Sequence, residues 1–378
     1  MHPSDASLGR RIGAVLVLTM FLVAAGGRSA TAPSDFPLRE VREADTVIRD
    51  FVFESGERLP ELRMHYYTLG TPKRDAQGRV TNAVLVMHGT TGDGTQFLQP
   101  SFAGELFGPG QPLDASTHFI VLRDSIGHGG SAKPSDGLRA RFPRYGYRDV
   151  VNADYRMLTE GLGVNHLKLV MGTSSGGMQT WLWGEMYPEF MHSLMPLGCL
   201  PVQISGRNRV WRRMISDAIR GDTDWRNGNY ARQPPSLRLA GQVAFFMSSN
   251  PRLRQQSMPT LAKADEVLDD FVAGFLEHAD ANDMLYAIES SYDYDPAPML
   301  EKIRARLVAI NSADDLIDPP ELGILEREIK RVPRGRSVMI PYDSNSRGHG
   351  SHTYPQLWKQ ELLKLLREVE ADTRNPGR

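Results

Sequence analysis

The stretch "VMGTSSGGMQT" contains the residues of this chain that are best suited to nucleophilic chemistry. Within it, Gly172 to Gly176 fit the pattern G-x-S-x-G, centred on Ser174. An apolar run precedes the pattern, and a helix-like run, "GGMQTWLWGEMYP", follows it. This context predicts a sharp turn between a strand and a helix, with glycines where side chains would collide. We therefore predict that Ser174 is a nucleophile and that the backbone N–H of Ser175 is one oxyanion donor.

A serine hydroxyl needs a base, and the base needs an orienting group, before it attacks at neutral pH. Two later segments, each just beyond an apolar run, offer such groups: "INSADDLIDPP" and "SRGHGSHTY". Parallel strands present chemistry at their C-terminal ends, so we expect both segments near the serine. For the acid we prefer Asp315, with Asp314 as the alternative and a solvated acidic turn as the non-catalytic interpretation. For the base we prefer His349, and we give His352 a supporting place. The two histidines could instead share a metal ion, but the sequence shows no further cluster of ligands for one.

The loop "MHGTTGDG" follows the first buried strand, where a second oxyanion donor is expected. We predict that the N–H of Thr90 is this donor and that His88 is structural. A second glycine-rich turn, "SIGHGGSAKP", lacks the G-x-G-x-x-G order and the acidic partner of a dinucleotide site. We therefore expect no bound cofactor, and we interpret this turn as part of the pocket wall.

The order of the predicted elements places these groups on an α/β fold. Thr46 to Gly70 read as a hairpin, and six apolar runs of strand length then alternate with helical segments. The strand-like runs are continuous rather than alternating, as in a parallel sheet buried on both faces: 83–89, 118–125, 167–174, 192–199, 306–312 and 337–344. The helical patterns lie at 149–163, 176–188 and 357–370.

The segment 201–302 breaks this alternation. Helix-like stretches at 209–222 and 264–279 are separated by the proline-containing "RQPPSLRL", without a convincing buried strand. A connection of this length indicates a lid or subdomain rather than a loop. We therefore predict a helical cap over 201–302, inserted between core segments 33–200 and 303–378.

Composition restricts the class of function. The 378 residues include 44 Lys and Arg against 45 Asp and Glu, so no basic field indicates a nucleic-acid partner. Cys199 is the sole cysteine, which excludes an internal disulfide. At the N-terminus, two arginines, an apolar run over 12–25 and "ATA" at 30–32 follow the pattern of a signal peptide. We predict a signal peptide over 1–32 and an exported, periplasmic or secreted protein; a retained membrane anchor is the alternative.

Several motifs of the chain resemble the homoserine O-acetyltransferase family of α/β-hydrolase enzymes. They include "GTSSGGMQTWLWGEMYP" at the predicted turn, "FPRYGYRDVVNADYRMLTEGLGV" before it and "RVWRRMISDAIRGDTDWRNGNY" at the start of the cap. "DLIDPP" and "RGHGSH" match the family's acid and histidine segments. The resemblance implies an α/β-hydrolase fold, a helical cap, a Ser174–His349–Asp315 triad and an acyl-enzyme, and it is compatible with a homodimer.

The chain departs from the family where the family grips homoserine. Gly350 follows the histidine, in the place of an aspartate that holds the amino group of homoserine. In the cap, Gly241 and Met247-Ser248 stand at the places of the family's arginine and tyrosine, and Arg238 lies nearby at a different point. The sequence thus carries the triad of this family without the residues of its acceptor site.

Three functions remain in competition. The first is a hydrolase, in which water cleaves the acyl-enzyme formed from a small-molecule acyl ester. The second is an O-acyltransferase acting on another alcohol, which shares every catalytic residue. The third is a non-catalytic binding protein, against which the ordered Ser, Asp and His set argues. We favour the hydrolase because the homoserine contacts are missing.

Overall fold

The computed structural model describes residues 40–374, whose strands form one eight-stranded sheet. The order across the sheet is β1-β2-β4-β3-β5-β6-β7-β8. From β4 to β8 all neighbours run parallel, whereas β1 and β2 form an antiparallel hairpin on the β4 edge. The strands are β1 Arg42–Val52, β2 Arg58–Leu69, β3 Ala83–Met87, β4 Phe119–Arg123, β5 Leu167–Thr173, β6 Met191–Leu197, β7 Arg306–Ser312 and β8 Gly335–Ile340.

The central strands match the continuous apolar runs of the sequence. Every residue of β3 ("AVLVM") and of β4 ("FIVLR") is buried, because helices cover both faces of the sheet. The hairpin and all six predicted strands are present, with ends that differ by up to four residues. The predicted fold class, a mostly parallel α/β sheet, is confirmed.

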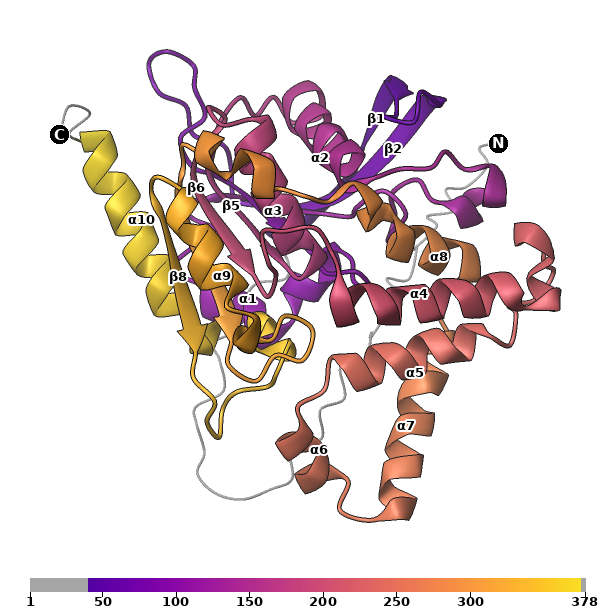
Figure 1. The fold of residues 1–378 in the computed structure, drawn as a ribbon. Helices are drawn as coiled ribbons and strands as arrows, with labels where there is room; N and C mark the ends of the chain where they lie inside the picture. The colour runs from indigo at the N-terminus through magenta and orange to yellow at the C-terminus, as the bar shows by residue number, and fades with distance from the viewer. Residues whose placement is uncertain (1–39, 375–378) are drawn as a thin grey trace, which may run out of the picture.

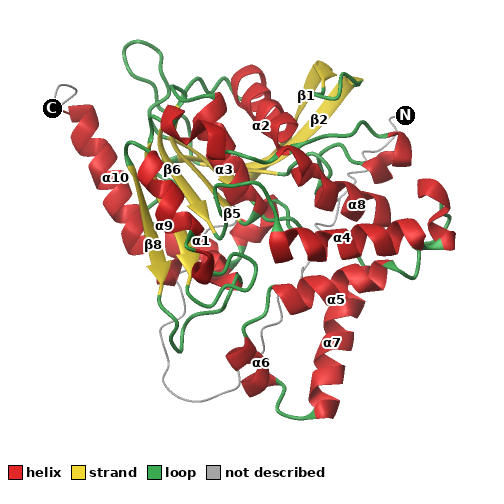
Figure 2. Cartoon of the chain, in the orientation of Figure 1, coloured by secondary structure: helices red, strands yellow, loops and turns green. Residues whose placement is uncertain are grey.

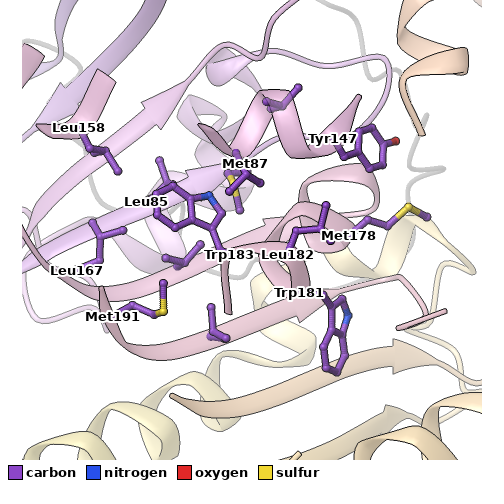
Figure 3. Packing of buried hydrophobic residues seen from close by; sticks show 14 of the residues in the cluster. Leu85, Met87, Tyr147, Leu158, Leu167, Met178, Trp181, Leu182, Trp183 and Met191 are labelled. Carbon is purple, nitrogen blue, oxygen red and sulfur yellow. The ribbon is translucent and has the colours of Figure 1, made fainter. Parts of the chain in front are cut away.

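Helices pack on both faces of the sheet (Figures 1 and 2). Residues of α2 and α3 join one core cluster, and residues of α1 and α10 join the cluster on the opposite face. Figure 3 shows Trp183 of α3 among Leu85, Leu167 and Met191 from three neighbouring strands. The helices outside the cap are α1 Pro100–Leu106, α2 Tyr147–Arg156, α3 Ser175–Met186, α9 Ile324–Glu328 and α10 Lys359–Arg374.

The insertion between β6 and β7 is helical, as expected. Its apolar cluster draws residues from α4, α5 and α8, and α7 extends from α5 away from the sheet (Figure 1). The two helices predicted in this segment correspond to α4 and α7, while α5, α6 and α8 were not predicted. The cap helices are α4 Gly206–Gly221, α5 Leu237–Met247, α6 Pro251–Ser257, α7 Leu261–Leu276 and α8 Ala281–Glu289. The exact boundaries proposed for core and cap stay a prediction.

The predicted signal peptide, residues 1–32, lies outside the described residues. Within 40–374, no helix combines the length and the apolar character that crossing a membrane requires.

Candidate active site

The turn between β5 and α3 presents Ser174. This residue has φ 54° and ψ −114°, a left-handed backbone conformation that a non-glycine residue rarely adopts. The glycines on either side are required by space. A Cβ on Gly172 would lie 2.2 Å from the carbonyl oxygen of Gly176, and a Cβ on Gly176 would lie 2.2 Å from the carbonyl oxygen of Met87. The G-x-S-x-G pattern therefore serves a strained turn pressed against β3.

Loops beyond β5, β7 and β8 bring Ser174, Asp315 and His349 together. The Oγ atom of Ser174 lies 2.9 Å from Nε2 of His349, and Nδ1 of His349 lies 2.7 Å from Oδ2 of Asp315. An ionised carboxylate only accepts hydrogen bonds, so Nδ1 carries the ring proton. This tautomer leaves Nε2 free to accept the proton of the Ser174 hydroxyl. The three groups predicted as base, acid and nucleophile thus form one hydrogen-bonded chain.

Burial and charge set the ionisation of this chain. Burial alone would lower the pKa of His349, but the negative charge and the hydrogen bond of Asp315 outweigh it and raise that pKa. Burial would likewise raise the pKa of Asp315, yet its interactions with His349 and two backbone N–H groups lower it. Both groups are buried, with 2 % of Asp315 and 6 % of His349 exposed. The pair is therefore arranged so that Asp315 stays ionised beside the His349 ring.

Asp314, the alternative acid, has a different place in the structure. Its Oδ1 accepts a hydrogen bond of 2.5 Å from the Ser312 hydroxyl. Its Oδ2 accepts from the backbone N–H of Gly348 at 2.9 Å and from the Asn250 amide. Asp314 thus joins the β7 loop, the segment before His349 and the start of α6, and its carboxylate is occupied by these contacts.

His352 packs against His349 with ring centroids 4.8 Å apart and the planes at 83°. Burial lowers its pKa to about 3, so the ring is neutral across the physiological range. Its contact with His349 matches the supporting place that the sequence suggested.

Two histidines hold the loop predicted to carry the second oxyanion donor. His88 donates from Nδ1 to the Gly89 carbonyl at 2.7 Å and accepts at Nε2 from the N–H of Ser125 at 3.0 Å. The His128 ring lies 2.9 Å from the carbonyl oxygen of Thr90. A Cβ on Gly89 would lie 3.4 Å from the Cβ of Ser174, so this loop runs directly beside the turn. His88 thus connects two loops by hydrogen bonds, and the contact of His128 was not predicted from the residue pattern.

Ser175 begins α3, where the first backbone N–H groups of a helix have no partner in the preceding turn. An anion next to Ser174 is stabilised by these groups and by the positive end of the helix dipole. The position of Ser175 is thus suited to the oxyanion role predicted for it.

One further carboxyl group lies beside the triad. Asp318 is 2 % exposed, and its Oδ2 lies 4.0 Å from Nδ1 of His349. Asp315, Asp318 and His349 are the one group of at least three acidic, cysteine or histidine side chains in residues 40–374 that are spaced for a metal ion. A metal ion there would have to displace the proton that Nδ1 shares with Asp315, and it would leave His349 without its orienting hydrogen bond. We interpret the cluster as an acid–base device.

The residues at the positions of the family's homoserine contacts have other surroundings. A Cβ on Gly241 would meet the ring of Phe275 on α7 at 2.9 Å, so this glycine permits close packing of two cap helices. Arg238 pairs with Asp269, and both side chains are exposed on the cap. Next to His349, a side chain at Gly350 would find open space, with Arg347 at 3.9 Å as the nearest neighbour.

Comparison with known proteins fits this architecture. Residues 82–363 match the family described as "alpha/beta hydrolase fold". The chain belongs to the α/β-hydrolase family. It is 30 % identical over 304 residues to a "Probable acyltransferase" of Methanothermobacter thermautotrophicus. This match covers 80 % of this chain and 92 % of the relative.

A homoserine O-acetyltransferase of Chlorobaculum parvum is 38 % identical over 198 residues. That match spans 49 % of this chain and about half, 52 %, of the relative. The solved structure of an acetylester hydrolase from Corynebacterium glutamicum superposes with a TM-score of 0.75 at 20 % identity, over 86 % of this chain and 96 % of that one. The chain is therefore an enzyme of the α/β-hydrolase family with acyltransferase relatives, it shares its fold with an acetylester hydrolase, and the resemblance to the homoserine O-acetyltransferases is confirmed.

Proposed function

We propose that this enzyme hydrolyses carboxylic acyl esters of small molecules through an acyl-enzyme on Ser174. The observation that carries the proposal is the continuous hydrogen-bonded chain from Ser174 through His349 to Asp315, at 2.9 and 2.7 Å. Nucleophile, base and orienting acid in this geometry have the roles of a serine-hydrolase triad. The strained backbone of Ser174 supports the same function, since strain at a turn often accompanies a functional site.

The reaction follows from these contacts. His349 accepts the hydroxyl proton of Ser174 at Nε2 while the serine oxygen attacks the ester carbonyl. The developing oxyanion is stabilised by the N–H of Ser175 and, in our proposal, by the N–H of Thr90. His349 then passes its proton to the leaving alcohol. In the second half, water loses a proton to His349 and attacks the acyl carbonyl. The bond to the serine oxygen then breaks, His349 returns the proton to that oxygen, and the carboxylic acid leaves.

Water rather than an amino acid is the acceptor that the surroundings of the triad favour. Homoserine brings an ammonium and a carboxylate, and each needs a charged partner when it is desolvated. Gly350 offers no carboxylate, Gly241 packs against Phe275, and Arg238 is already paired with Asp269. The loss of one such partner weakens binding by about 2–5 kcal/mol. The second candidate, an O-acyltransferase acting on another alcohol, is favoured by the description of the Methanothermobacter thermautotrophicus relative.

Two further parts of the proposal come from the sequence. The signal-peptide pattern over 1–32 leads us to propose export to the periplasm or the medium. The family resemblance leads us to propose a homodimer, with no nucleic-acid partner. Outside the cytoplasm, coenzyme A thioesters are not an expected acyl source, which again favours hydrolysis.

The test compares two reactions of the purified mature enzyme. One reaction contains short-chain aryl esters, and the other contains acetyl-coenzyme A with homoserine or simple alcohols. We expect ester cleavage that is lost in Ser174→Ala and kept in Ser175→Ala. Robust formation of O-acetylhomoserine with little ester cleavage would overturn the hydrolase proposal.

A further inference from the structure

Asp318 is a buried acid whose position the triad mechanism does not require. Its Oδ2 lies 4.0 Å from Nδ1 of His349, and within residues 40–374 it has no hydrogen-bond partner for that atom. The backbone N–H of Asp318 donates to Oδ1 of Asp315 at 3.1 Å, so the two acids belong to one tight turn. Two carboxyl groups thus lie near one ring nitrogen of His349, and the single N–H of that nitrogen already donates its hydrogen bond to Asp315.

Asp315, Asp318 and His349 cannot hold two ionised carboxylates and a neutral imidazole in this buried space without a cost in free energy. With His349 neutral, two ionised carboxylates in this buried space would repel each other, and burial makes each charge more expensive. The proton goes to Asp318. Burial, and then the charge of Asp315, raise the pKa of Asp318 to about 7, whereas the pKa of Asp315 is lowered.

The neighbours of Asp318 come from the cap as well as from the core. Arg212 of α4 is 1 % exposed, and its positive charge acts on both Asp318 and His349. Asn208, one turn earlier on α4, accepts a hydrogen bond from Nε of Arg212 at 3.0 Å, and its polar side chain lowers the pKa of Asp318. The remaining titratable neighbours, Cys199 and Tyr294, are buried and neutral, because burial and nearby acids raise the pKa of each well above its usual value.

We propose that Asp318 is a positioning residue whose proton sets the pH range in which His349 acts as a base, and that Asn208 and Arg212 tie this setting to the cap. When Asp318 is ionised, a second negative charge near Nδ1 favours the imidazolium form of His349. When Asp318 is protonated, only Asp315 does so. Because α4 supplies the partners of Asp318, a shift of the cap changes the strength of the base. This inference rests on the proposed roles of Ser174 and His349.

The test reads His349 without a substrate. The rate at which a fluorophosphonate modifies Ser174 is measured from pH 5 to pH 9, since it depends on neutral His349. Asp318→Asn removes the charge and keeps the size of the side chain. The acid limb is the part of the profile in which the labelling rate falls as the pH decreases. We expect its midpoint in Asp318→Asn to move to lower pH by about 0.5–1 unit. This is at the low end of the shifts that a charge at this distance causes, because Asp318 is only partly ionised in that pH range. The labelling rate at the plateau should stay within about tenfold of the unaltered enzyme. Asp295→Asn, an exposed acid, is the matched control and should leave the limb in place.

The link to the cap has its own variant. Asn208→Ala removes a polar side chain that favours the ionised form of Asp318, so its acid limb should move in the same direction by less. In combination with Asp318→Asn it should add nothing further, because both changes act through one group. Independent, additive shifts would overturn the link between α4 and the triad.

Three results would contradict the role of Asp318. One is an acid limb that does not move in Asp318→Asn. Another is a loss of labelling rate in Asp318→Asn as large as in Asp315→Asn at every pH, which would make Asp318 the triad acid. If Asp318→Asn does not fold, the Nδ1 proton of His349 in the unaltered protein is followed by NMR. Two inflections with pH support the proposal, and a single one contradicts it. Absence of ester turnover with normal labelling would instead refute the proposed function and leave this inference standing.

Discussion

Replacement of Asp315 by asparagine tests the assignment of the triad acid, because its neighbour Asp314 provides a matched comparison. In Asp315→Asn, the Nδ1–H of His349 loses its charged acceptor at 2.7 Å, and an amide NH₂ turned toward the ring favours the tautomer with the proton on Nε2. That tautomer cannot accept the proton of Ser174. The same substitution in a serine-protease triad lowers kcat by about 10⁴. We expect a similar loss here, which corresponds to about 5.4 kcal/mol in the activation free energy.

Asp314→Asn should act on stability rather than on rate. The Asp314 carboxylate accepts hydrogen bonds from the Gly348 N–H, the Ser312 hydroxyl and the Asn250 amide, and none of these groups reacts. Weakening such charge-assisted bonds costs about 1–3 kcal/mol in the free energy of unfolding. The loop before His349 would loosen, so we expect a loss of rate below about tenfold.

The assay measures kcat/KM on an aryl acetate at pH 8, with thermal unfolding followed by circular dichroism for both variants. Asp315→Asn should keep its Tm within a few degrees and lose its activity. Asp314→Asn should show the reverse. If Asp314→Asn, folded, proved the more damaging to kcat/KM, the assignment of Asp315 as the acid would be wrong.

Three further predictions concern other parts of the molecule. The pKa of His349 is raised above 6.5, and the ring must be neutral to accept a proton, so activity should fall as pH decreases through a midpoint above 6.5; a midpoint below 6 in a pH–rate profile would contradict this. Gly176→Ala places a Cβ 2.2 Å from the Met87 carbonyl and should destabilise folding by about 1–3 kcal/mol or more in urea unfolding, whereas Gly221→Ala, with open space around it, should change stability by at most about 0.5 kcal/mol. Export from a host with the full-length gene should yield a chain that begins near Pro33, and N-terminal sequencing that finds Met1 on the exported protein would refute cleavage.

The parts of the fold that the sequence predicted share one property, which is a strong local pattern. The run "AVLVM" of β3 is buried throughout, and such a run is typical of a strand covered on both faces. The turn at Ser174 could be predicted because its glycines are dictated by contacts within a few residues and with the adjacent strand. Helix α5 was not predicted because the proline-containing "RQPPSLRL" runs into its first turn and because Phe246, 67 % exposed, places an apolar residue on its outer face.

The contacts that the sequence did not predict join residues far apart in the chain. Asp318 follows Asp315 by three residues, yet nothing in "DLIDPP" indicates that its carboxyl turns toward His349. Its partners Asn208 and Arg212 come from a cap helix that precedes it by about a hundred residues in the sequence. The contact of His128 with the Thr90 carbonyl likewise depends on how two loops meet. Such contacts arise from tertiary packing, which residue spacing does not encode.

The central claim is that Ser174 forms a covalent acyl-enzyme with the help of His349. Mass spectrometry of the purified enzyme after reaction with a fluorophosphonate, followed by peptide mapping, tests it most directly. We predict one adduct per chain, located on Ser174, present in Ser175→Ala and absent in Ser174→Ala, and formed far more slowly in His349→Ala. An adduct on Ser175, or no adduct on the folded enzyme, would contradict the claim.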